Sequence, residues 1–91
     1  MAAQGTATVD FGTGATDARV TVSGQTGITN SSLAEAWVWP IATASNTADD
    51  TLYSELRVIA CNVVAGSGFD IVVMSDEGIA HGIHTVAWVW N

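Results

Sequence analysis

Apolar and polar side chains alternate along most of this chain, and the alternation predicts short β-strands. In an extended strand, the side chains of residues i and i+2 lie on the same face. Segments with this period-two pattern cover roughly residues 6–11, 18–23, 33–41, 56–64, 69–74 and 81–90. Glycines and small polar residues separate these segments, as is typical of turns. The pattern therefore predicts an all-β fold.

The strongest local pattern is that of a β-hairpin. Residues 56–64 and 69–74 are joined by the glycine-containing turn 65–68, an arrangement typical of paired antiparallel strands. About six to eight short strands with such turns indicate a small antiparallel β-sandwich of jelly-roll or immunoglobulin-like type. A small barrel is the alternative. We expect residues 1–5 to be a flexible N-terminal arm and residues 6–91 to be a single sandwich domain.

One stretch has no hydrophobic periodicity, and it lies in the middle of the chain at residues 42–50. Thr47 and Asp50 have the spacing of a weak capping box, which would start a helix. Both a short helix at about 48–55 and an irregular loop are compatible with this segment.

The phrase Ala-Trp-Val-Trp occurs twice, at residues 36–39 and 87–90, and it contains all four tryptophans of the chain. In a strand, each copy places two indoles on one face and Ala and Val on the other. Such a strand has no obviously wet side, so we expect it to be central in a sheet or at a subunit contact. A pair of exposed indoles that stacks on a sugar is the alternative. The predicted interface or packing residues are Trp37, Trp39, Trp88 and Trp90.

Two residues in or beside the strand of the first phrase restrict where that strand can lie in the sheet. Pro40 has no backbone N–H, so it should end the ladder or mark an edge strand. Glu35 is predicted to share a face with Trp37. If that face is buried, the carboxylate needs a cation, and Arg19 or Arg57 would have to supply it.

Composition supports a sheet and suggests assembly. Val, Ile and Thr supply 11, 6 and 11 of the 91 residues, whereas Leu supplies 3; β-branched residues suit a pleated sheet. A domain this small has a limited core, yet 48% of its residues are hydrophobic. Burial between subunits would hide the excess. We therefore expect a homo-oligomer, with a trimer as the expected state.

Charge excludes several partners. The chain has no lysine, its strong bases are Arg19 and Arg57, and its net charge is −7. This balance argues against binding to nucleic acid or to an anionic membrane. Met1 is followed by no apolar signal segment and no long apolar run occurs, so we expect an intracellular product without a transmembrane helix.

No catalytic, cofactor-binding or metal-binding set emerges from the remaining polar residues. His81 and His84 are three apart, so on a strand they point to opposite faces and could share a metal only across symmetry-related copies. The acidic pairs Asp49-Asp50 and Asp76-Glu77 lack the spacing of a calcium loop. Cys61 is the single cysteine and lies in an apolar run, which favours an inert thiol and excludes an intrachain disulfide. We expect no enzyme.

Several short phrases follow one another along the chain. They are Thr-Val-Asp-Phe-Gly at 8–12, Val-Thr-Val-Ser-Gly-Gln-Thr-Gly-Ile at 20–28, Glu-Ala-Trp at 35–37, Thr-Ala-Asp-Asp at 47–50, Ala-Gly-Ser-Gly-Phe at 65–69 and Val-Ala-Trp-Val-Trp-Asn at 86–91. In this order they resemble a group of small, largely uncharacterised proteins encoded among the virion structural genes of tailed bacteriophages. The likeness covers nearly the whole chain, and its motifs are structural rather than catalytic.

This resemblance implies a non-enzymatic virion structural protein that is assembled in the host cytoplasm. Its partners would be further copies of itself and other virion proteins, such as the major capsid or tail proteins. We favour an oligomeric capsid decoration protein. The alternative is a tail or head fibre module that contacts host surface glycans, and a small hydrolase or metal-dependent enzyme is the third hypothesis.

Overall fold

The computed structural model describes residues 3–43, 46, 56–75 and 78–91, and this part of the chain contains six β-strands. In chain order they are β1 (Ala3–Asp10), β2 (Asp17–Val22), β3 (Ala34–Val38), β4 (Leu56–Val64), β5 (Gly68–Ser75) and β6 (Ile83–Trp90). The described residues form no helix, as the Val, Ile and Thr content predicts.

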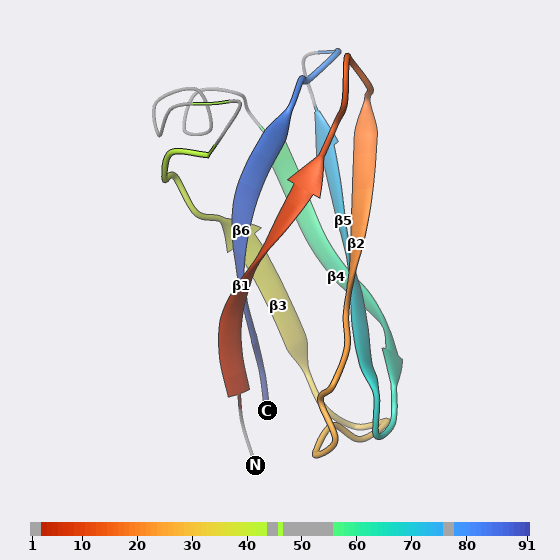
Figure 1. Ribbon diagram of the computed structural model, residues 1–91. Coiled ribbons are helices and arrows are strands. Elements are labelled where there is room, and N and C mark those ends of the chain that lie inside the picture. Colours follow the sequence, from red (N-terminus) through yellow and green to blue (C-terminus); the bar gives the residue numbers. More distant parts are fainter. Residues whose placement is uncertain (1–2, 44–45, 47–55, 76–77) are drawn as a thin grey trace.

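The strands form two three-stranded sheets that pack face to face (Figure 1). One sheet has the order β1-β6-β3 and the other has the order β2-β5-β4. Every neighbouring pair is antiparallel. The prediction of a small antiparallel β-sandwich is therefore confirmed. The alternative of a small barrel is wrong, because the described strands pair within two separate sheets rather than around one closed sheet.

The predicted hairpin is present, with β4 and β5 joined by a tight turn. A β-bulge interrupts the register of β4 between Cys61 and Val64, and Asn62 has a φ of 55° there. Gly68 opens β5 against the end of β2, where a Cβ atom would overlap the carbonyl oxygen of Val22. Glycine is thus required at this point for the backbone of β5 to approach β2.

The prediction of a flexible N-terminal arm is wrong for residues 3–5, because these residues belong to β1. Ala3, Gln4 and Gly5 pair with Trp90, Val89 and Trp88 of β6. The cause is the alternation of small apolar and polar residues, which begins at Ala3 rather than at Thr6 and supplies a second partner for β6. The helix considered for residues 48–55 lies outside the described residues.

The second Trp strand, β6, is central, as predicted, since it lies between β1 and β3. The first, β3, is an edge strand that ends at Val38, two residues before Pro40. Pairing continues briefly, because the backbone N–H of Trp39 donates to the carbonyl of Thr85 at 3.0 Å. Asn91 and Leu33 exchange backbone hydrogen bonds of 3.1 and 3.2 Å, which fasten the last residue to the sheet.

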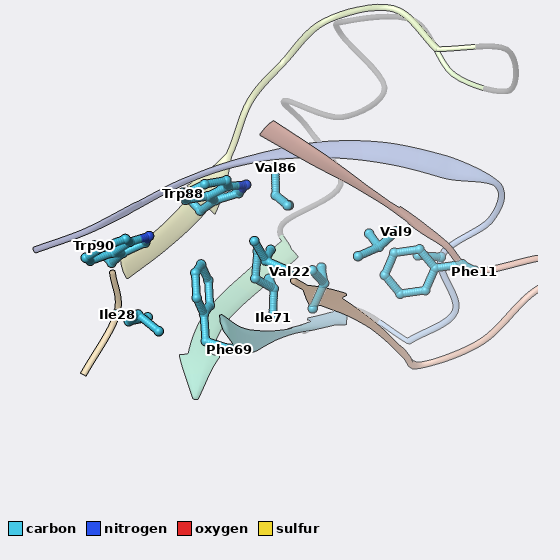
Figure 2. Close-up of a cluster of buried hydrophobic side chains, with 11 residues drawn as sticks. Val9, Phe11, Val22, Ile28, Phe69, Ile71, Val86, Trp88 and Trp90 are labelled. Atoms are coloured by element: carbon cyan, nitrogen blue, oxygen red, sulfur yellow. The ribbon is translucent and has the colours of Figure 1, made fainter. Parts of the chain in front are cut away.

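The core lies between the two sheets (Figure 2). Trp88 and Trp90 project from β6 toward Phe69 and Ile71 of β5 (Figure 2). Phe69 and Trp88 meet edge to face with ring centroids 5.6 Å apart, a preferred geometry for aromatic pairs. Among the described residues, the buried apolar side chains of this core cluster are Val9, Phe11, Val22, Ile28, Phe69, Ile71, Val73, Ala80, Val86, Trp88 and Trp90.

Candidate functional site

The two Trp pairs lie on opposite faces of one sheet. Trp88 and Trp90 are 8% and 2% exposed and belong to the core, whereas Trp37 and Trp39 are 43% and 47% exposed. Trp88 and Trp90 therefore pack in the core of a single copy. In a single copy the indole face of the first phrase is open to solvent, so a contact with another subunit or a ligand at this face stays a prediction.

The strand register explains this division. In the antiparallel pairing of β3 with β6, Ala36 lies opposite Trp88 on the inner face, and Trp37 lies opposite Ala87 on the outer face. Residues directly opposite each other on neighbouring strands project to the same side of the sheet. Trp37, Trp88 and Trp90 therefore each have an alanine beside them, whereas Trp39 lies beside Thr85.

The outer face of the β1-β6-β3 sheet carries three cross-strand rows. The middle row is Thr6, Ala87 and Trp37. Ala87 is only 9% exposed although it points outward, because the side chains of the two flanking strands rise beside it. The first row is Gln4, Val89 and Glu35, and the third is Thr8, Thr85 and Trp39.

A groove runs along this face between β1 and the exposed indoles. It has a volume of about 330 Å³. We call it the Trp groove. Trp37 and Trp39 form one wall, the polar side chains of β1 form the other, and the floor is the backbone of β6 with Ala87. Its lining residues are Gln4, Gly5, Thr6, Trp37, Trp39, Ala87 and Trp88.

The lining of the Trp groove carries no charged side chain. Glu35, in the row next to Trp37, is the nearest carboxylate along β3. The sequence predicts a cationic partner for Glu35 only if this side chain is buried. Glu35 is exposed, so it needs no such partner. Arg19, one of the two candidate partners, instead forms a 3.7 Å ion pair with Asp70.

The outer face of the β2-β5-β4 sheet is different in chemistry. Asp70 accepts hydrogen bonds from Thr21 Oγ1 at 2.8 Å and from Asn62 Nδ2 at 3.1 Å, and it pairs with Arg19. The hydrogen bond from Thr21 is the main reason why the pKa of Asp70 lies below its usual value of 3.8, with Asn62 and Arg19 acting in the same direction. These interactions therefore favour the ionised form of the carboxylate.

The same face carries aliphatic side chains beside the polar cluster. Ile59 is 43% exposed, and Val72 and Met74 are half-buried. Arg57 lies across β5 from Asp17, with Met74 between them. This face is therefore a mixture of aliphatic and oppositely charged groups and has no tryptophan.

The two histidines do not form a site together. His81 is exposed, whereas His84 is 1% exposed and packs edge to face against Phe11 at 5.7 Å. Asn46 fastens this end of β6 by donating to the carbonyls of His81 and Ile83 at 3.0 and 2.9 Å. No cluster of three or more metal-ligating side chains occurs among the residues that the structure describes.

The other polar candidates stay apart from one another. Cys61 is a half-buried free thiol on the outer face of β4, opposite Asp70. The acidic pairs Asp49-Asp50 and Asp76-Glu77 lie outside the described residues.

The sequence predicted the indoles but missed the β1 side of the Trp groove. Gln4, Gly5 and Thr6 fall within or beside the segment that was expected to be an arm. The signal was present, because Gln4, Thr6 and Thr8 alternate with small apolar residues in the same period-two pattern as the recognised strands.

The sequence matches no protein-family model, no curated protein matches it, and no solved structure matches its fold. Within the described residues, there is no helix with the length and apolar character needed to cross a bilayer.

Proposed function

We propose that this chain is a non-enzymatic structural protein of a tailed-bacteriophage virion, and that it decorates the capsid as an oligomer. The observation that supports the proposal best is the amount of apolar surface that one copy leaves uncovered. The described residues include several large exposed apolar side chains: Leu33, Trp37, Trp39, Ile41, Ile59, Val64 and Ile79. Surfaces of this kind are typical of proteins that work in contact with other proteins. The resemblance of the sequence to virion structural proteins supports the assignment of the chain to a bacteriophage particle.

The outer face of β2-β5-β4 is the surface on which we place the contact between copies. Val72 and Met74 of the central strand and Ile59 of β4 are aliphatic, and Asp17 and Arg57 lie at opposite edges of one row. A second copy can therefore bury Ile59 and Met74, while the charged side chains at the two edges of the row stay at the rim of the contact. Contacts that join a charged rim to an apolar centre are typical of stable interfaces.

Analytical ultracentrifugation of the purified chain tests this contact. We expect an oligomer, with a trimer as the expected state, and we expect Ile59→Asp to reduce it to monomers. Trp37→Ala, on the opposite sheet, is the matched control and should leave the oligomer intact. A wild-type chain that sediments as a monomer at high concentration would remove the oligomer from the proposal.

The location of the chain in intact particles tests the virion role. Capsid decoration predicts many copies spread over the capsid lattice, and deletion of the gene should lower the temperature at which particles release DNA. Absence of the chain from purified particles would contradict the proposal.

The second candidate function is a fibre or receptor-binding module that contacts host glycans. The open indole face of Trp37 and Trp39 specifically favours it, because these side chains lie beside a groove rather than in the core. It predicts few copies at a tip or vertex, and deletion should abolish adsorption to the host while the capsid keeps its stability.

A further inference from the structure

We propose that the Trp groove binds a neutral saccharide chain, whose sugar rings stack on Trp37 and Trp39 and whose hydroxyl groups bond to Gln4 and Thr6. The inference deepens the second candidate function and rests on it for the source of the ligand, a glycan on the host surface. The binding chemistry is carried by the groove itself, and the argument for it has four parts.

The first part is the geometry of the indoles. Trp37 and Trp39 are two residues apart, so they project from the same face about 7 Å apart along the strand. Both keep nearly half of their surface in water, which is costly for a flat apolar ring unless a ligand covers it. Two adjacent flat rings form a platform suited to successive flat units of a chain molecule, as in other stacking sites.

The second part is the polar wall. A sugar ring combines apolar C–H faces with a rim of hydroxyl groups, so its site needs a flat apolar surface next to hydrogen-bonding groups. Across Ala87 from Trp37, Thr6 offers a hydroxyl and the neighbouring Gln4 offers an amide. Within the part of the chain that the structure describes, neither side chain has a hydrogen-bond partner. Both are therefore available to a ligand.

The third part is charge. The lining residues include no cation, and the net charge of the chain is −7. A phosphorylated, sulfated or otherwise acidic glycan would be repelled, with Glu35 on the same face adding to the repulsion. The amide and hydroxyl groups of the β1 wall are neutral, and they match a neutral saccharide.

The fourth part separates this ligand from a second copy of the protein. A sheet packed on this face would bury Gln4, Thr6 and Thr8 together with Glu35. Burial of these groups without partners costs free energy for each group. A saccharide supplies hydroxyl groups at its rim and can satisfy them.

Titration of tryptophan fluorescence tests the proposal on the purified full chain. The probes are neutral oligosaccharides of glucose, galactose, mannose and N-acetylglucosamine, with heparin and polygalacturonate as acidic controls. We expect saturable binding of at least one neutral probe, little dependence on salt, and no binding of the acidic controls. Calorimetric titration of the same probes reports binding independently of the fluorophore.

Variants assign the binding to the groove. Trp37→Ala and Trp39→Ala should each weaken it at least tenfold, and Gln4→Ala should weaken it several-fold. Val64→Ala changes an exposed apolar side chain at the end of β4 on the other sheet, and it should leave binding unchanged. Thermal melting of each variant checks that the fold is kept.

Three results would overturn the proposal. They are the absence of saturable binding to every neutral probe, binding that survives the Trp37→Ala/Trp39→Ala double variant, and loss of oligomers in that double variant, which would assign the face to a second copy. None of them bears on whether the chain is found in virions, so failure of this inference is distinguishable from failure of the virion role.

Discussion

The two copies of Ala-Trp-Val-Trp have the same local sequence and opposite environments. The indoles of β6 fill the space between the sheets, whereas Trp37 of β3 and Trp39 just after it lie on the outside of the same sheet. Local sequence alone therefore does not determine which face of a strand is buried. The pairing register does so, because it sets Ala36 beside Trp88 and Ala87 beside Trp37. The core accepts one pair of indoles and the other pair remains available to a ligand.

The largest expected effect comes from the inner pair. Trp88→Ala removes a buried indole that packs edge to face on Phe69, and it should lower the free energy of unfolding by about 3–5 kcal/mol. Equilibrium denaturation in urea, followed by circular dichroism, measures it. A loss below about 1 kcal/mol would show that the inner pair does not support the core, and the contrast between the two pairs would fail.

The second-largest effect on stability is expected at Gly5, which lies against the buried indole of Trp88. A Cβ atom at Gly5 would lie 2.6 Å from Trp88 Cζ2, and the buried ring has little room to move away. Gly5→Ala should therefore lower the free energy of unfolding by about 1–3 kcal/mol. Thr6→Ala, the neighbouring change on the outer face, is the control and should be nearly neutral. Equal effects of the two changes would contradict the assignment of faces in β1.

The outer face of the β2-β5-β4 sheet carries the charged residue Asp70, unlike the lining of the Trp groove on the other sheet. Because the pKa of Asp70 is lower in the folded protein than in the unfolded chain, its stabilisation is present above the unfolded value and is lost as pH falls through the folded value. Asp70→Asn should therefore lower the melting temperature at pH 7. The difference from wild type should shrink as the pH falls below about 4. A difference that stays constant from pH 7 to pH 2 would exclude the ionised carboxylate as its cause.

The smallest effect on stability is expected from the outer pair. Trp37→Ala and Trp39→Ala remove side chains that are nearly half exposed, so each should change the free energy of unfolding by less than about 1 kcal/mol. The same denaturation experiment as for Trp88→Ala measures the change. A loss comparable to that of Trp88→Ala would mean that the outer indoles are buried in the protein as it exists in solution.

Sequence alone predicted the all-β class, the hairpin of β4 and β5 and the central place of β6, because period-two patterns and glycine turns are local signals. It did not predict that Trp37 and Trp39 face outward. Both faces of β3 carry apolar residues, so only the partner strand decides which face is buried. It also missed the start of β1, because Ala3 and Gly5 are weak strand formers and made the period-two alternation with Gln4 and Thr6 easy to overlook.

Chemical oxidation of the tryptophans, mapped by mass spectrometry, tests the central contrast most directly. With limiting N-bromosuccinimide on the native protein, we predict that Trp37 and Trp39 are oxidised first, while Trp88 and Trp90 react only after unfolding. A bound neutral saccharide should protect the outer pair. Oxidation of all four at one rate, or protection of all four in the native protein without ligand, would contradict the account.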